Sequence, residues 1–300
     1  MYLACITIFC LTVFASNSIY CRAALVSCDM GPLLYTGVRG LIAALILALL
    51  CGIRIIKPLP RAEGTGSVWR DAWQQSSWIG AFGLFAYMLS FSAGYVAMPS
   101  APGTLIINMC VQVSMIGWGM LHGIHPNKKQ YIGYAIATLG LLYLLSPGLT
   151  APPLLHSLFM AISGFAWGVF TIAGRDAKSA ALATAGSFWR AALPGSICAI
   201  AGLVMEAQPH SLAWLFVLAG GLASSLGYIL WYAIVPRYSL VDISIIQLAV
   251  PVITAILGII FLAEAITLRF VISTCLILGG ICLAIKAHHH HEAAKAATRE

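Results

Sequence analysis

Two arginines stand inside long apolar runs of the sequence. Arg39 and Arg190 each lie about seven residues from the start of their run, which is roughly 10 Å along a helix. A buried arginine is costly unless it is paired, hydrated or able to reach the surface. One interpretation is a pair of anion contacts for a carboxylate substrate, one on each side of a central cavity. The other interpretation is that each guanidinium caps backbone carbonyls of a neighbouring helix.

Polar and aromatic residues inside the same runs are the other candidates for a substrate path. Polar side chains avoid lipid and turn toward the interior of a helix bundle, whereas aromatic residues near helix ends often belong to the interfacial belt. We therefore predict that the path is lined by members of this set, together with the two arginines. The set is Asn17, Tyr87, Asn108, Gln112, Trp167, Tyr228, Trp231, Tyr232 and Gln247.

Three other local patterns have structural interpretations. Pro251 removes one backbone hydrogen bond and is predicted to kink its run, which makes it a candidate gating hinge. Gly164 and Gly168 form a GxxxG pattern, which favours close helix packing inside the bundle. Ser239 and Asp242 have the spacing of a capping box at the start of a helix.

Several kinds of catalytic and cofactor chemistry are not predicted. No carboxylate lies deep in a run. If these runs cross a membrane and carry a solute through it, we expect the transport to be facilitative or to be coupled without a buried carboxylate. Motifs for phosphate binding, for zinc proteases and for serine hydrolases are missing. We predict no cofactor and no metal site, and we interpret the run His288 to His291 as a solvated tail.

The composition identifies the elements that carry these residues. Hydrophobic residues make up 61% of the 300-residue chain and charged residues 8%, whereas about a quarter of residues are charged in a soluble protein. About 20 apolar residues cross a bilayer as a helix. We predict an all-α polytopic membrane protein with ten transmembrane helices, at residues 2–20, 32–53, 78–98, 102–121, 130–145, 154–173, 183–205, 212–234, 241–263 and 268–285.

The positions of lysine and arginine predict the orientation. With a cytoplasmic N-terminus, the external connections hold only Arg22 and Arg269, against 12 basic residues in cytoplasmic connections. This bias is typical of the positive-inside rule, so both termini are predicted to be cytoplasmic. The cytoplasmic set is Arg54, Lys57, Arg61, Arg70, Lys128, Lys129, Arg175, Lys178, Arg237, Lys286, Lys295 and Arg299. The net charge is +7, but the basic residues lie in short connections, where they set the orientation in a bilayer. No nucleic-acid partner is therefore predicted.

The two halves of the chain have matching landmarks. Arg22 closes the first run and Arg175 the sixth, while Arg39 and Arg190 fall early in the second and seventh. Five spans per half is an odd number, so the halves are predicted to be inverted repeats, as in many secondary transporters. The predicted units are a first repeat at 1–149, a second at 150–286 and a cytoplasmic tail at 287–300.

Short motifs in the second half match a known family in order and spacing. They are Ser163 to Gly168, Phe188 to Ala191, Ile229 to Tyr232, Gln247 to Ala255, Leu262 to Glu264 and Leu278 to Gly280. With these motifs the chain resembles the EamA-type ten-helix branch of the drug/metabolite transporter superfamily. The first half keeps Phe14 to Arg22, Arg39 and Ser90 to Gly103, but Val111 and Ile124 stand where members often have a proline and a glutamate.

The resemblance implies a multi-pass transporter of the inner membrane, often an exporter of amino acids or other small metabolites. The expected partners are a small-molecule substrate and the lipid bilayer, with the protein as a monomer or a weak homodimer. Alternating access around a central cavity is the expected mechanism. The alternative is an integral membrane enzyme acting on a lipid-linked substrate, which needs clustered catalytic His, Asp or Glu near one face. A receptor or assembly subunit is a further alternative, which usually brings a sizeable soluble domain.

Overall fold

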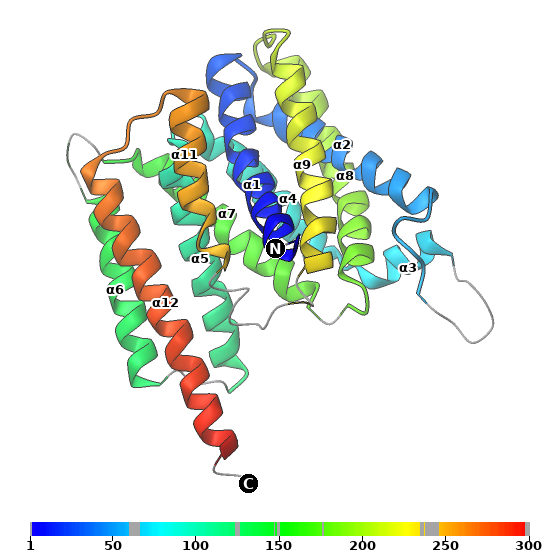
Figure 1. The fold of residues 1–300 in the computed structure, drawn as a ribbon. Helices are drawn as coiled ribbons and strands as arrows, with labels where there is room; N and C mark the ends of the chain where they lie inside the picture. Colours follow the sequence, from blue (N-terminus) through cyan, green and yellow to red (C-terminus); the bar gives the residue numbers. More distant parts are fainter. Residues whose placement is uncertain are drawn as a thin grey trace.

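The computed structural model is an all-helical bundle (Figure 1). It describes residues 2–59, 67–123, 127–146, 148, 151–175, 177–234, 237 and 246–297. The helices are α1 (Tyr2–Arg22) with the π-helical turn η1 (Ala23–Ser27), α2 (Pro32–Gly52), α3 (Val68–Gln75), α4 (Trp78–Tyr95), α5 (Ser100–Leu121), α6 (Lys128–Leu145), α7 (Leu154–Ala173), α8 (Ala180–Met205), α9 (Ala213–Ile234), α11 (Val250–Leu262) and α12 (Leu268–Ala297).

Each of the ten predicted runs coincides with one of these helices, and eight agree within three residues at both ends. The ninth run differs because a turn at Leu248 and Ala249 precedes α11, which begins only at Val250. The tenth differs because α12 continues to Ala297, into the predicted tail. The predicted start of the ninth run and the predicted capping box at Ser239 and Asp242 lie outside the described residues.

Most of the described helices are suited to a membrane. Seven of them (α1 with η1, α2, α5, α7, α8, α9 and α12) are long and apolar enough to cross it, and α3 with α4 makes an eighth if the bent pair is one span. The shorter α11 has 13 residues, and α6 has Lys128, Lys129 and Gln130 in its first turn. The chain is therefore an all-α, polytopic membrane protein.

The short helix α3 was not predicted. It is amphipathic: Val68, Asp71 and Ala72 are buried, and the helix packs against α8, whereas the side chains of Trp69 and Trp73 are each 48% exposed. The chain then turns by 80° into α4. A connection of this composition has no long apolar run, so hydropathy alone does not reveal the helix.

Small residues allow close packing between helices. A Cβ atom at Gly37 of α2 would lie 2.4 Å from the backbone of Ala199 on α8, so only glycine fits this crossing. Gly164 and Gly168 of α7 face Ile107 and Ser114 of α5 in the same way. The GxxxG pattern thus packs two helices of the same chain, as predicted.

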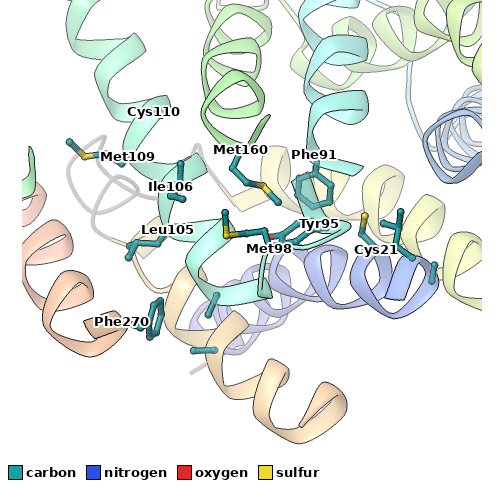
Figure 2. Close-up of a cluster of buried hydrophobic side chains, with 14 of the residues drawn as sticks. Cys21, Phe91, Tyr95, Met98, Leu105, Ile106, Met109, Cys110, Met160 and Phe270 are labelled. Atoms are coloured by element: carbon teal, nitrogen blue, oxygen red, sulfur yellow. The ribbon is translucent and has the colours of Figure 1, made fainter. Parts of the chain in front are cut away.

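The helices form a main bundle with one pair at its side. Figure 1 shows α6 and α12 lying together at one edge, opposite α3. Asn127 donates a hydrogen bond to the carbonyl of Ala287 at one end of this pair, and Arg269 donates to the carbonyl of Ser146 at the other. Figure 2 shows Tyr95, Met98 and Met160 converging in the core where α1, α4, α5 and α7 meet.

Candidate functional site

Arg39 lies in the centre of the main bundle, inside a cage of aromatic rings. Its side chain is 1% exposed. The guanidinium carbon is 4.9 Å from the ring centre of Phe91, 5.5 Å from that of Tyr35 and 5.9 Å from that of Tyr87. These are cation–π distances, and each such contact contributes about 0.5–2 kcal/mol.

The polar atoms of this cage are not satisfied by their surroundings. The hydroxyl groups of Tyr35 and Tyr87 lie close enough to the guanidinium to interact with it electrostatically and as hydrogen-bond partners of loose geometry. None of its three nitrogens, however, reaches hydrogen-bond geometry with a described residue, and neither does the Tyr35 hydroxyl. A buried charge without an ionic partner costs several kcal/mol, so the cage is the least compensated polar region among the described residues.

An aromatic surface extends from this cage to α7 and α9. The ring of Tyr87 lies 4.7 Å from that of Trp167, and Trp167 stacks on Tyr228 at 5.3 Å with an interplanar angle of 26°. Phe14 of α1 contacts the rings of both Tyr228 and Trp231. Four of the predicted site residues, Arg39, Tyr87, Trp167 and Tyr228, are therefore brought together by four different helices.

Buried hydroxyl and amide groups surround this surface. The Ser224 hydroxyl of α9 donates to the Asn17 side chain at 3.3 Å, which places a fifth predicted residue beside α9. The Thr36 hydroxyl donates to Ser92 at 2.8 Å and so links α2 to α4. Nearer one end of the bundle, the hydroxyls of Ser18, Tyr95 and Thr104 form a chain across α1, α4 and α5.

Arg190 has a different environment from Arg39. Its guanidinium donates to the Trp73 carbonyl at 2.9 Å and to the Ser76 hydroxyl, both at the C-terminal end of α3. It also lies 3.8 Å from the ring centre of Trp73 and 5.5 Å from that of Trp78. Carbonyls at a helix C-terminus carry partial negative charge, so this arginine holds α3 against the bundle.

At the opposite end, Arg22 and Glu264 form an ion pair that joins four helices. Arg22 of α1 also donates to the carbonyls of Tyr95 and Met98, just where α4 ends. Glu264 follows α11 and accepts hydrogen bonds from the backbone NH and the hydroxyl of Ser100, the first residue of α5. We call this end of the bundle the Glu264 end.

A second glutamate caps a helix at the Glu264 end. Glu206 follows α8 and accepts hydrogen bonds at 2.9 Å from the backbone NH groups of Leu33 and Leu34 in the first turn of α2. A carboxylate is favourable at a helix N-terminus because it complements the free NH groups and the helix dipole. Both glutamates therefore make helix-terminal contacts.

The remaining predicted site residues are placed elsewhere. Asn108 donates to the Thr104 carbonyl of its own helix, and Gln112 lines a separate pocket of about 210 Å³ between α5, α6 and α12. Gln247 is partly buried just before α11, and Pro251 occupies the first turn of that helix, where its missing NH is harmless. The side chain of Tyr232 lies outside the described residues.

Sequence reasoning missed Tyr35 and Phe91. Tyr35 lies four residues before Arg39, and Phe91 lies four residues after Tyr87. Residues at this spacing share one face of a helix, so a search for partners one helical turn from each predicted residue finds both.

Comparison with known proteins places the chain in a family. The pattern of the EamA-like transporter family matches residues 154–286. An uncharacterised protein of Pseudomonas aeruginosa is 35% identical over 284 residues, which cover 93% of each chain. One solved crystal structure shares the fold, with a TM-score of 0.62 at 19% identity over 95% of this chain and 97% of that one. The chain belongs to the EamA-like transporter family of the drug/metabolite transporter superfamily.

Proposed function

We propose that the protein is a secondary transporter that exports a small metabolite, such as an amino acid, across the inner membrane. In this proposal ten helices cross the bilayer as two inverted five-helix repeats, at residues 1–149 and 150–286. Substrate binds between the repeats, and alternating access carries it across. Membership of the EamA-like transporter family is the observation that carries the proposal.

The pairing of helices supports the repeat. Suppose that α1, α2, α4, α5 and α6 correspond in order to α7, α8, α9, α11 and α12. The contact of α1 with α9 then corresponds to that of α7 with α4, and α1 with α11 corresponds to α7 with α5. The contact of α2 with α9 corresponds to that of α8 with α4, while α2–α8, α5–α11 and α6–α12 map onto themselves. Each of these contacts is present, as a pseudo-two-fold arrangement requires.

The positions of the carboxylates favour transport over catalysis. Glu206 and Glu264 cap helices, and Asp71 accepts a hydrogen bond from the backbone of Leu59. These three groups sit on separate elements, and each accepts a hydrogen bond from a backbone NH group. An enzyme acting on a lipid-linked substrate needs acidic or histidine side chains that converge on one point.

The substrate site in this proposal is the centre of the main bundle. Arg39, Tyr87, Trp167 and Tyr228 come from α2, α4, α7 and α9, which belong to both proposed repeats. A site built from both repeats changes shape when one repeat moves against the other, as alternating access requires. Asn17 and Trp231 extend this site along α1 and α9.

A toxicity-rescue screen tests the proposal. Cells that express the protein and cells with an empty vector are challenged with a panel of amino acids, their analogues and other small metabolites at growth-inhibiting concentrations. The expected result is tolerance to one compound or a few, with lower intracellular levels of those compounds. The purified protein in liposomes is then expected to move the same compounds. No rescue and no movement of any compound would contradict transport.

A fusion experiment tests the orientation. A reporter that is active only in the cytoplasm is joined after Ala297, and a second fusion is joined after Ser146, which lies at the Glu264 end of α6. Activity is expected from the first fusion and not from the second, because the basic connections favour cytoplasmic termini. The reverse pattern would contradict this part of the proposal.

A further inference from the structure

We propose that Arg39 and Tyr35 bind the carboxylate of the transported substrate, whose apolar body lies along Tyr87, Trp167 and Tyr228. The inference rests on the proposed transport function and names the substrate class of the same site. That class is small organic carboxylates with an apolar or aromatic body, apolar and aromatic amino acids included.

Buried polar atoms without full hydrogen-bond geometry are concentrated at Arg39 and Tyr35. Among the described residues, nine buried side-chain nitrogen and oxygen atoms have no hydrogen-bond partner, and four of them belong to Tyr35 and Arg39. The two residues lie one helical turn apart on α2, with the guanidinium carbon 5.5 Å from the tyrosine ring. The Tyr35 and Tyr87 hydroxyls interact with the guanidinium, but none of the Arg39 nitrogens reaches full hydrogen-bond geometry with a described residue. Buried polar groups are normally satisfied, so this guanidinium and the adjacent Tyr35 hydroxyl have donor capacity left for an oxyanion.

The charge and shape of the Arg39 guanidinium also suit a carboxylate. The Arg39 guanidinium lies among aromatic rings and the hydroxyls of Tyr35 and Tyr87, and no described carboxylate pairs with it. A planar guanidinium matches a carboxylate with two parallel hydrogen bonds, which are stronger than bonds between neutral groups. A bound carboxylate supplies the missing negative charge and the missing acceptors together.

A glycine of α9 faces these donors. A Cβ atom at Gly220 of α9 would lie 2.4 Å from the Tyr35 hydroxyl and 3.5 Å from Cδ of Arg39. Only a residue without a side chain leaves the Tyr35 hydroxyl undisturbed here. Glycine at position 220 therefore leaves the side chains of Tyr35 and Arg39 in their positions.

An aromatic surface lies beside the donors. Tyr87 contacts both the Arg39 guanidinium and Trp167, and Trp167 stacks on Tyr228. A ligand with its carboxylate on Arg39 therefore has flat apolar rings next to it, against which an apolar or aromatic body packs favourably. This arrangement selects amphipathic acids over strongly polar ones.

Binding of matched acids and amides tests the inference. The full-length protein is purified in detergent and titrated by calorimetry with three pairs: L-leucine and L-leucinamide, L-phenylalanine and L-phenylalaninamide, 3-phenylpropionate and 3-phenylpropionamide. We expect at least one acid to bind, and its amide to bind about tenfold or more weakly, because the amide lacks the charge that strengthens the hydrogen bonds.

Four variants identify the receptor. Arg39→Met is expected to abolish the preference for the acid, and Arg39→Lys to keep a smaller one because the charge remains without the bidentate fork. Gly220→Ala is expected to weaken acid binding although every charge is unchanged. Arg190→Met is the matched control that removes an arginine elsewhere, and it is expected to keep the preference. Circular dichroism and size-exclusion profiles verify that each variant is folded.

Three outcomes would overturn the inference. They are amides that bind as tightly as their acids, an acid preference that persists in Arg39→Met, and a panel in which no acid binds. The rescue screen judges the transport proposal separately. Rescue confined to compounds without a carboxylate leaves transport standing and removes the carboxylate receptor.

Discussion

Arg39 and Arg190 occupy matching positions in the two halves of the chain, and their side chains are similarly buried, with 1% and 6% exposed. Their surroundings nevertheless differ. Arg190 donates hydrogen bonds to the end of α3 and stacks closely on Trp73. Arg39 has three aromatic rings at 4.9–5.9 Å, and none of its nitrogens reaches hydrogen-bond geometry with a described residue.

In our proposal, this difference separates an arginine that stabilises the fold from one that binds a ligand. The hydrogen bonds and the close ring contact of Arg190 offset its desolvation. The rings around Arg39 offset only part of its desolvation. An anion that binds at Arg39 gains an electrostatic attraction that no described carboxylate of the folded protein uses. We therefore place the proposed substrate site at this arginine.

The largest expected effect is the loss of transport in Arg39→Met without a loss of stability. In liposomes, the initial rate for a carboxylate substrate is expected to fall by about tenfold to a hundredfold, since a charge-assisted pair contributes about 1.5–3 kcal/mol. The melting temperature in detergent is expected to stay equal or to rise, because methionine removes an unpaired buried charge.

Melting is followed by the intrinsic fluorescence of the tryptophans, with the amount of reconstituted protein measured by immunoblot. Arg39→Lys serves as the control that keeps the charge. A melting temperature several degrees lower in Arg39→Met would mean that Arg39 is mainly a structural residue, and the comparison with Arg190 would collapse.

The next effect is a dependence of flux on substrate at the far side of the membrane. When the carrier closes without substrate, the charge of Arg39 stays unpaired. When it closes with a bound carboxylate, the two opposite charges form a neutral pair. Return of the empty carrier is therefore expected to be the slow step. Substrate on the opposite side is expected to accelerate efflux from preloaded liposomes by about threefold to tenfold, since about 1 kcal/mol suffices for this change.

Liposomes with buffer alone on the opposite side are the control for this experiment. Equal efflux with and without opposing substrate would mean that the empty carrier returns freely. In that case the cost of the unpaired Arg39 does not limit the transport cycle.

Much of the fold could be predicted from the sequence because a bilayer imposes a simple rule. A helix that crosses lipid needs a long apolar run, and each of the ten predicted runs coincides with a helix. The helix that was missed, α3, lies in a connection and pairs a small buried face with exposed tryptophans. Its position depends on packing against α8, which hydropathy does not report.

The candidate site was predicted less completely, for a related reason. The sequence made Arg39 and Arg190 equal candidates for the substrate path, since both stand early in an apolar run. What distinguishes them is the end of α3, which supplies acceptors to Arg190 alone. The cage residues Tyr35 and Phe91 are ordinary apolar-run residues in one dimension, and only the fold brings them to the guanidinium.

A smaller effect is expected at Arg190, in stability. Arg190→Met removes two hydrogen bonds and leaves the Trp73 carbonyl without this donor. The loss of about 1–3 kcal/mol is expected to lower the melting temperature by about 2–6 °C. Limited proteolysis is also expected to cleave near α3 faster. An unchanged melting temperature with strongly reduced transport would instead assign Arg190 to the substrate path.

The smallest effect is expected at the Glu264 end. Glu264→Gln replaces the carboxylate that pairs with Arg22, but the amide oxygen still accepts a hydrogen bond from Ser100. Arg22 also keeps the carbonyls of Tyr95 and Met98. The expected loss is therefore about 1 kcal/mol or less, and the melting temperature should fall by about 2 °C or less.

Glu264→Ala is the sharper companion variant, since it also removes the acceptors for the first residue of α5. A helix N-terminus that loses its cap costs about 1 kcal/mol more, so this variant is expected to melt below Glu264→Gln. Equal melting of the two variants would mean that the ion pair dominates over the cap. The Glu264 end would then be stabilised mainly by the ion pair between Arg22 and Glu264. Arg22 would join Arg190 as an arginine whose charge is compensated, in contrast to Arg39.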